Sequence, residues 1–315
     1  MDQQLPTPAG QHQHLLNTAL KSISSIILGK QHQINLALSC LLAGGHLLIE
    51  DLPGVGKTTL SLTLARVFGL DFQRIQFTSD LLPSDVLGVS IYDANSHSFT
   101  FHQGPIFTQV LLADEINRST PKTQSALLEA MEERQVTQDG KTRPLPQPFF
   151  VVATQNPMEQ VGTFPLPESQ LDRFLMRINI GYPDQHAEME LLKGCNRHDL
   201  IQQLKTIIQP AQLIEMQQSV EKIHMSQAIL DYVLALIRSS RLSPWFITGL
   251  SPRAGLALQK CARAWALLQG RDHVLPEDIQ LLLPSVAAHR LQINPEHQDK
   301  DLNELVNMLI KQVPV

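Results

Sequence analysis

Apolar residues along the first half of the chain follow helical spacing in some segments and form short continuous runs in others. Residues 15–43 repeat apolar side chains at helical spacing on both sides of Gly29, which predicts helix. Further on, helical segments alternate with short apolar runs that predict strands at 46–49, 74–77, 110–113, 149–154 and 175–180. Strands separated by helices favour a parallel sheet joined by right-handed crossovers.

Two segments interrupt this alternation. Residues 85–104 contain two alternating runs around the polar turn Ala94-Asn95-Ser96-His97, a pattern that predicts a β-hairpin. Residues 135–148 predict a second hairpin, which turns at Asp139-Gly140.

The pattern changes after Gly181-Tyr182-Pro183. From residue 184 onward the apolar spacing is helical and no further strand is expected. We therefore expect an α/β domain over residues 15–183 and an all-helical domain over residues 184–315, preceded by a flexible tail over residues 1–14. Within the helical domain, Ser251 is the expected N-cap of a helix that has Pro252 at its first position.

Composition narrows the classes of protein. The 315 residues are 43% hydrophobic, enough for a full core, and their formal net charge is −5 with no block of Lys and Arg. The electrostatic footprint of a duplex-binding protein is therefore missing. The cysteines Cys40, Cys195 and Cys261 are far apart, which makes a zinc site or disulfide framework improbable and fits a reducing cytoplasm. We expect no signal peptide and no bilayer-spanning segment; membrane contact through a partner stays open.

Residues Asp51–Thr58, Asp-Leu-Pro-Gly-Val-Gly-Lys-Thr, lie between an expected strand and an expected helix. This is the context of a phosphate-binding loop, because glycines let backbone N–H groups curl around phosphate oxygens. We expect Lys57 to reach the β- and γ-phosphates and Thr58 to bind Mg²⁺. The expected nucleotide-binding residues are Pro53, Gly54, Val55, Gly56, Lys57, Thr58 and Thr59. Asp51 stands where the general pattern has glycine.

Polar residues end two of the expected strands. Asp114 and Glu115 follow the apolar run 110–113, so Asp114 is expected to hold Mg²⁺ through water and Glu115 to polarise the attacking water as general base. Asn156 follows the strand at 149–154, where its amide could orient that water. An acidic surface turn and a simple Asn-Pro turn are the alternatives for the two motifs.

Two arginines complete the candidate site. Arg173 comes just before the last expected strand and is placed to face a neighbouring subunit. Arg253 lies in the first turn of a helix, where the helix dipole disfavours a cation, and this position suggests a phosphate partner. For each arginine, a solvated or ion-paired surface role is the alternative.

Six strings together are highly specific and resemble the AAA+ ATPases, more closely the MoxR family. They are Leu47–Thr58, Phe101–Phe107, Ala113–Arg118, Gln124–Glu133, Ala153–Pro157 and Leu166–Phe174. The resemblance covers about residues 20–292 and implies a P-loop ATPase core with a parallel sheet flanked by helices, followed by a helical lid. It also implies assembly into a ring, commonly a hexamer, that hydrolyses ATP with Mg²⁺.

By the same resemblance, the site residues take the family's roles. Lys57 and Thr58 match Walker A, and Asp114 and Glu115 match Walker B. Asn156 matches sensor 1, Arg173 the arginine finger and Arg253 sensor 2. Segments 85–104 and 135–148 match the helix-2 insert and pre-sensor hairpin of this branch. MoxR-type ATPases are thought to mature or activate client proteins, often with von Willebrand factor A domain partners.

Three other functions are alternatives for a chain with these motifs. A nucleic-acid ring motor needs basic pore hairpins, but residues 85–104 have no Lys or Arg and residues 135–148 have only Lys141 and Arg143. A metal-chelatase motor subunit has a similar core, and ATPase assays with porphyrin and metal would separate it. A non-hydrolysing nucleotide-binding scaffold is disfavoured because Glu115, Arg173 and Arg253 are present.

Overall fold

The structure is a computed structural model, and it describes residues 8–95, 97–157, 162–194, 197–297 and 299–314. Ser96 of the first predicted turn and Cys195 lie outside the described residues.

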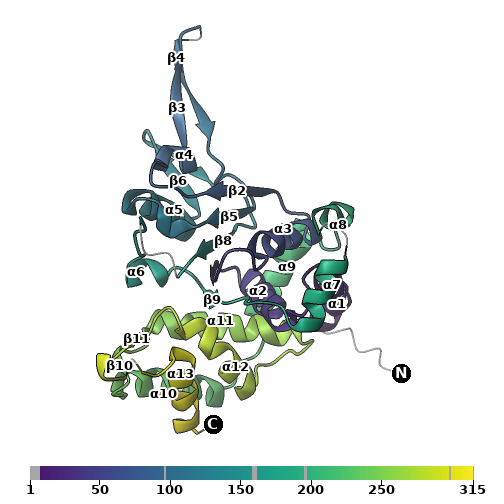
Figure 1. Cartoon of the computed structure of the whole chain (residues 1–315), viewed down its shortest axis with the longest axis vertical. Helices are drawn as coiled ribbons and strands as arrows, with labels where there is room; N and C mark the ends of the chain where they lie inside the picture. The colour runs from purple at the N-terminus through teal and green to yellow at the C-terminus, as the bar shows by residue number, and fades with distance from the viewer. Residues whose placement is uncertain (1–7, 96, 158–161, 195–196, 298, 315) are drawn as a thin grey trace.

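A five-stranded parallel sheet forms the centre of the molecule (Figure 1). Its strands are β1 (Leu47–Glu50), β2 (Phe72–Gln76), β5 (Val110–Asp114), β8 (Phe150–Gln155) and β9 (Met176–Ile178). Their order across the sheet is β2-β5-β8-β1-β9, and all neighbours are parallel. The predicted parallel sheet and its strands are therefore confirmed. The strand β1 pairs with β8 on one side and with β9 on the other. The loop that follows β1 therefore lies at the carboxyl end of an interior strand.

The interior strands of this sheet are buried on both faces, as is usual in a parallel sheet, whereas the edge strand β2 leaves Gln73, Arg74 and Gln76 exposed. Along β1, Leu47 and Ile49 belong to one hydrophobic cluster, whereas Leu48 belongs to a second cluster on the other face. The strands β5 and β8 divide their side chains between the two clusters in the same way. Because successive side chains of β1, β5 and β8 enter opposite clusters, the runs of these strands are apolar and do not alternate with polar residues.

Helices cover the two faces. One face packs against α1 (Pro8–Ile26), α2 (Gln31–Leu42) and α3 (Lys57–Val67), and the other against α4 (Pro83–Leu87) and α5 (Pro121–Glu133). The expected helix over residues 15–43 is divided into α1 and α2, and the break between them includes Gly29, with φ of 69°. The expected tail of residues 1–14 was too long, because α1 begins at Pro8. Its buried Leu16, Ala19 and Ile23 anchor the helix on the core.

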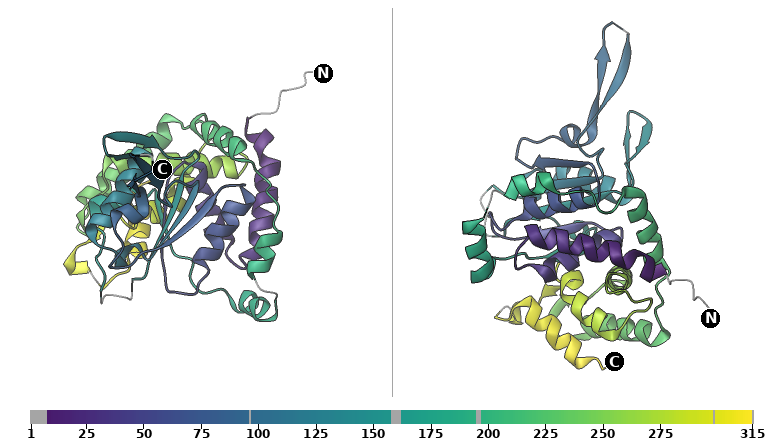
Figure 2. Two further views of the ribbon diagram at one scale, coloured as in Figure 1. Left: turned by 90° about the horizontal axis from the view of Figure 1, so that it is seen from above. Right: turned by 90° about the vertical axis from the view of Figure 1, so that its right-hand side faces the viewer.

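Two hairpins project from the side of α4 and α5 (Figure 2). The longer hairpin pairs β3 (Gly88–Asp93) with β4 (Ser98–Gln103), and the shorter one pairs β6 (Gln135–Gln138) with β7 (Lys141–Pro144). Asp139 and Gly140 both have positive φ, 53° and 70°, which is the geometry of a two-residue type I′ turn. Both predicted hairpins are confirmed.

The chain after residue 183 is mainly helical. Its helices are α7 (Gln185–Lys193), α8 (Arg197–Gln203), α9 (Pro210–Glu221), α10 (Gln227–Leu242), α11 (Pro252–Leu268), α12 (Pro276–Ala287) and α13 (Leu302–Gln312). Figure 1 shows α10 to α13 gathered below the sheet, while α8 contacts α1 and α3 beside the core. Ser251 caps α11 by accepting a hydrogen bond from the Ala254 N–H, as expected.

The helical region also contains a short strand pair that the sequence analysis missed. The strands β10 (Phe246–Thr248) and β11 (Gln292–Ile293) pair antiparallel, so the expectation of no strand after residue 184 was wrong. Runs of two and three residues are too short to show a periodicity of two. Three further short elements are described: α6 (Glu168–Leu171) and the 3₁₀ turns Ile116–Arg118 and Pro295–His297. None of the described helices is long and apolar enough to cross a membrane.

Candidate ATPase site

The glycine loop between β1 and α3 has the backbone of a phosphate cradle. Gly54 and Gly56 have φ of 85° and 96°, in the left-handed region that favours glycine. A Cβ atom at either position would have no atom within 4 Å, so the concave side of the loop is open. Lys57 begins α3, whose positive dipole end therefore points into the same space.

Asp51, which departs from the glycine of the general pattern, turns its side chain away from this cradle. Its carboxylate accepts hydrogen bonds from the Leu52 N–H at 2.9 Å and from the Gly181 N–H at 2.6 Å. The residue is only 8% exposed. The substitution therefore leaves the cradle open and connects the start of the loop to the segment that follows β9.

Lys57 lies at the floor of the cradle. Its ammonium donates to the Asp51 carbonyl oxygen at 2.7 Å. Partial burial lowers the pKa of Lys57, and the carboxylates of Asp114, Asp51 and Glu115 oppose this lowering. The ammonium attracts an anion, while the surrounding carboxylates attract a cation. The site is therefore suited to a triphosphate with a bound metal ion.

Asp114 ends β5 and Glu115 follows it, at the same end of the strands as the loop. The Asp114 carboxylate accepts from the Arg74 guanidinium at 2.7 Å and from the Thr154 hydroxyl at 2.6 Å. The Thr154 hydroxyl oxygen also accepts from the Glu115 N–H at 2.9 Å. Thr154 thus connects β8 to both members of the acidic pair. It holds the Asp114 carboxylate and the Glu115 backbone in place.

The Glu115 side chain is held from two sides. Its Oε2 accepts from the Gln76 amide at 2.7 Å and from the Arg118 guanidinium at 2.9 Å. The backbone of Glu115 has φ of 56°, an uncommon value for a residue with a Cβ. Such strain is typical of functional sites, and here it directs the carboxylate over the end of β5.

These groups enclose one pocket of about 370 Å³. The residues that line it are Pro53, Gly54, Gly56, Lys57, Thr58, Thr59, Arg74, Gln76, Asp114, Glu115 and Asn156. The sheet order explains this convergence, because β8 lies between β1 and β5 and is followed directly by Asn156. Val55, expected among the nucleotide-binding residues, packs its side chain against the hydrophobic core, so only its backbone can face a phosphate.

The donor set of the pocket fits a magnesium ion. Thr58 and Asp114 supply hydroxyl and carboxylate oxygens, which are the hard ligands that Mg²⁺ prefers. The described residues contain no group of three or more His, Cys, Asp and Glu side chains that could hold a metal alone. Mg²⁺ commonly binds through one or two protein oxygens with water and substrate phosphates, so this sparse set is sufficient.

Arg173 and Arg253 lie elsewhere and do not line the pocket. Arg173 binds the Leu128 carbonyl oxygen at 2.8 Å and the Glu132 carboxylate at 3.2 Å. Arg253 binds the other oxygen of the same carboxylate at 2.9 Å. The two arginines are therefore neighbours, brought together at the C-terminal end of α5.

Sequence reasoning missed several residues of the site. Arg74 and Gln76 share one face at the carboxyl end of β2, where an amide–guanidinium hydrogen bond of 3.1 Å joins them. The alternation Arg-x-Gln at a strand end was a usable signal, but it acquires meaning only once β2 is known to pair with β5. Thr154 was hidden inside an apolar strand and carried no signal of its own.

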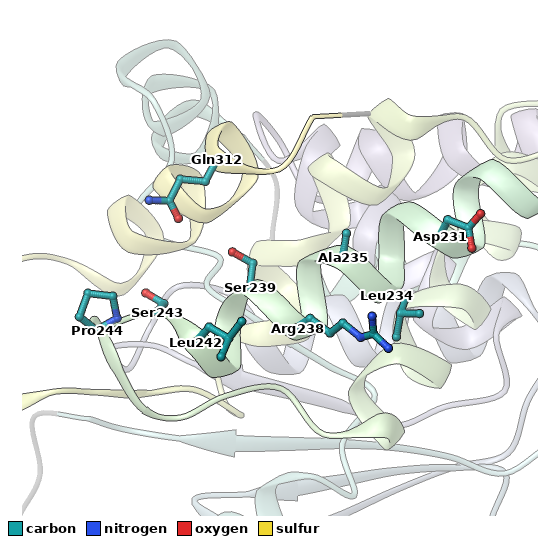
Figure 3. Close-up of a pocket in the computed structure, with 9 residues that line it drawn as sticks. All are labelled: Asp231, Leu234, Ala235, Arg238, Ser239, Leu242, Ser243, Pro244 and Gln312. Carbon is teal, nitrogen blue, oxygen red and sulfur yellow. The ribbon is translucent and has the colours of Figure 1, made fainter.

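A larger pocket of about 750 Å³ lies on the helical domain (Figure 3). It is lined by Asp231, Leu234, Ala235, Arg238, Ser239, Leu242, Ser243, Pro244 and Gln312, from α10, α13 and the chain between them. The lining has no glycine loop and no pair of carboxylates. It therefore lacks the chemistry that the smaller pocket beside Lys57 provides.

A glycine loop after β1, an acidic pair at the end of β5 and a helical domain below the sheet define a P-loop ATPase of the AAA+ class. Comparisons with known proteins agree with this class. The family profile "ATPase family associated with various cellular activities (AAA)" matches residues 46–176, and the "AAA lid domain" profile matches residues 238–308.

Individual relatives identify the family. The chain is 49% identical to "Uncharacterized protein YeaC" of Bacillus subtilis, covering 90% of this chain and 88% of that one. It is 42% identical to "Chaperone MoxR1" of Mycobacterium tuberculosis, covering 88% and 76%. A crystal structure of a "putative ATPase" from Cytophaga hutchinsonii has a TM-score of 0.89 at 36% identity, covering 98% and 96%. The chain belongs to the MoxR family of AAA+ ATPases.

Proposed function

We propose that this chain assembles into a ring, commonly a hexamer in its family, in which hydrolysis of Mg-ATP drives the remodelling or activation of client proteins. Membership of the AAA+ ATPases implies nucleotide binding and ATP hydrolysis in general. The observation that supports the ring is the position of Arg173 relative to the chain's own phosphate loop.

The parallel sheet separates these two features. The strands β1 and β9 are neighbours, with Leu47 opposite Met176 and Ile49 opposite Ile178. The phosphate loop follows the carboxyl end of β1, whereas Arg173 precedes the amino end of β9. They therefore lie at opposite ends of the strands and are separated by at least the length of one strand, roughly 13 Å. This separation supports a role for Arg173 at the nucleotide of an adjacent copy, and not at that of its own chain.

Within each site, the proposed roles follow the geometry of the pocket. Lys57 binds the β- and γ-phosphates, and Thr58 and Asp114 hold Mg²⁺, which supplies charge neutralisation to the phosphates when bound. Glu115 takes the proton of the attacking water, and Asn156 orients that water. Arg173 and Arg253 of the neighbouring copy approach the γ-phosphate and stabilise the charge that develops on it.

The longer hairpin suits contact with protein. Near its tip, Tyr92 and Phe99 pack edge to face, with ring centroids 5.4 Å apart. They remain 52% and 73% exposed. An isolated two-stranded hairpin is marginally stable in water, so a projecting hairpin with exposed aromatic rings is expected to gain stability from a bound apolar segment. A partner with a von Willebrand factor A domain is the class that the family resemblance suggests.

The hairpins favour a protein client over nucleic acid. The insert at residues 85–104 has no Lys or Arg. On the shorter hairpin, the Arg143 guanidinium lies 3.7 Å from the centroid of the Phe101 ring. A cation committed to an aromatic ring is a poor contact for a phosphate backbone, which binds through unengaged Lys and Arg. We therefore expect no direct binding of nucleic acid.

Mixing two inactive variants tests the shared site. Arg173→Ala should bind ATP but lose about 10³–10⁵-fold in hydrolysis. Lys57→Ala should lose nucleotide binding. In mixed rings, the first variant supplies a sound phosphate loop and the second a sound Arg173, so partial activity should return. Arg66→Ala, which changes an exposed arginine on α3, is the matched control and should hydrolyse ATP normally.

Specific activity of the wild-type chain should also rise with protein concentration, because hydrolysis requires assembly. Two results would contradict the proposal. One is activity independent of concentration, and the other is no rescue in mixtures shown by native mass spectrometry to contain both variants.

A further inference from the structure

One carboxylate, that of Glu132, binds arginines from two different parts of the chain. Its Oε2 lies 3.2 Å from Nη1 of Arg173, which precedes β9. Its Oε1 lies 2.9 Å from Nη2 of Arg253, which opens α11. Because one carboxylate holds both guanidinium groups, its geometry fixes their spacing.

The position of Glu132 is unfavourable without these partners. It lies in the last turn of α5, where the negative end of the helix dipole disfavours an acid by about 0.3–1 kcal/mol. The two guanidinium groups would likewise repel each other if no anion stood between them. The carboxylate therefore stabilises the close approach of the two arginines, in addition to the Leu128 carbonyl oxygen that binds Arg173.

The ion pairs continue beyond Glu132 into a larger network. Asp172 lies 3.7 Å from the Arg253 guanidinium and 2.5 Å from that of Arg290. The Arg290 side chain is only 4% exposed, and it also donates to the carbonyl oxygens of Asp172 and Phe174. Three arginines thus share two carboxylates, which leaves one positive charge in excess.

Some guanidinium N–H groups of Arg173 and Arg253 are also available to donate hydrogen bonds. Among the described residues, Arg173 uses only Nη1 in hydrogen bonds and ion pairs, and Arg253 uses only Nη2 and Nε. The Nε and Nη2 groups of Arg173 and the Nη1 group of Arg253 can therefore bind an anion from outside. Two guanidinium groups at fixed spacing match the several oxygens of a phosphate.

We propose that Glu132 is a positioning residue for ATP hydrolysis, which holds Arg173 and Arg253 together so that both engage the triphosphate bound by a second copy of this chain. The inference rests on the proposed function. Glu132 touches neither nucleotide itself, and it acts through the two arginines. By this assignment, Glu132 acts on the copy that supplies the two arginines and not on the copy that binds the nucleotide. It does so although it lies on the helix that follows Glu115.

Glu132→Gln tests the assignment, with Glu133→Gln as the matched control, because Glu133 is the adjacent exposed acid. A displacement of about 1 Å in a positioned group can cost ~100-fold in rate. We expect kcat of Glu132→Gln to fall to that extent, while its KM and its affinity for a fluorescent ATP analogue stay within about 3-fold of wild type. Glu133→Gln should match the wild type in all three quantities.

Mixing Glu132→Gln with other variants shows on which side of the subunit contact Glu132 acts. Glu132→Gln should regain activity with Lys57→Ala, which carries an intact Glu132, but not with Arg173→Ala, which lacks Arg173. A purely structural role would weaken both sides of the subunit contact and would not give this pattern. If Glu132→Gln does not fold, Glu132→Asp keeps the charge but shortens its reach by one methylene, and its kcat should also fall.

Wild-type kcat in the variant that folds, or rescue by Arg173→Ala, would overturn the role of Glu132. The pair Lys57→Ala and Arg173→Ala is measured alongside. If that pair shows no rescue, the shared site itself fails. If it is rescued while Glu132→Gln keeps full kcat, only the inference on Glu132 fails.

Discussion

His46 should make the stability of this protein decrease in mild acid. The residue precedes β1 and is only 6% exposed. Its Nδ1 accepts a hydrogen bond from the Val151 N–H at 3.0 Å, so the ring proton must be on Nε2, which lies 3.3 Å from the Met131 carbonyl oxygen. A second proton on Nδ1 would face the Val151 N–H and break that hydrogen bond. The fold therefore requires the neutral ring.

The size of the effect follows from the pKa. Burial is the main cause that lowers the pKa of His46 from 6.5 to about 4, and the nearby Arg134 adds to it. At ~1.4 kcal/mol per pH unit, this lowering corresponds to about 3 kcal/mol of stability. Because the folded-state pKa is the lower one, the full contribution is present above 6.5 and is lost progressively as the pH falls towards 4. Between about pH 7 and about pH 5, the loss amounts to about 2 kcal/mol.

Urea denaturation at about pH 7 and about pH 5 measures this difference. Glu or Asp at position 46 would add a charge, so the test uses His46→Gln, whose amide can accept and donate in similar directions. For each protein, the free energy of unfolding at the lower pH is subtracted from that at the higher pH, which cancels the cost of the substitution itself. This difference should be about 2 kcal/mol larger for the wild type than for His46→Gln. His186→Gln, at an exposed position, should behave as the wild type. Equal pH differences in wild type and His46→Gln would refute the reasoning.

Four further predictions concern the site and the hairpin. Glu115→Gln should bind ATP with little loss but hydrolyse it about 10²–10⁴-fold more slowly, because a positioned base is lost; near wild-type turnover would remove Glu115 from the mechanism. Lys57→Ala should weaken binding of a fluorescent ATP analogue, and unchanged affinity would show that the triphosphate lies elsewhere. Replacing Tyr92 and Phe99 by Ser should keep basal ATPase activity but reduce its stimulation by an unfolded protein such as casein; equal stimulation would exclude a role in client binding. Arg290→Met should lower the free energy of unfolding by about 3 kcal/mol, because it leaves the Asp172 carboxylate without its buried partner, and a urea midpoint at the wild-type value would contradict this.

Local patterns were sufficient to predict the sheet and its hairpins. The interior strands β1, β5 and β8 are buried on both faces and are therefore mostly apolar, which separates them clearly from the polar loops, whereas the edge strand β2 carries exposed polar residues. The phosphate loop and the acidic pair were visible because each follows directly on such a run. Asp139-Gly140 specified its turn because both residues tolerate positive φ.

Contacts between distant segments could not be predicted in the same way. The ion pair of Arg74 with Asp114 depends on the pairing of β2 with β5, and nothing near Arg74 in the sequence indicates it. The shared binding of Arg173 and Arg253 by Glu132 depends on where the helical domain packs against the core. Such contacts follow from tertiary structure alone, so the sequence predicted the residue types of the site better than their partners.

The strand β9 lies between two features that the proposed shared site requires. Its amino end is preceded by Arg173, and the chain beyond its carboxyl end reaches Gly181, whose N–H is held by the Asp51 carboxylate at the root of the phosphate loop. In a ring of the proposed kind, this short segment has the chain's own nucleotide at one end and the neighbour's at the other. A shift of the loop on binding or release of phosphate would pass along the backbone to the next site without crossing a flexible linker. The cycle of each subunit would then set the timing of the next, in one direction around the ring.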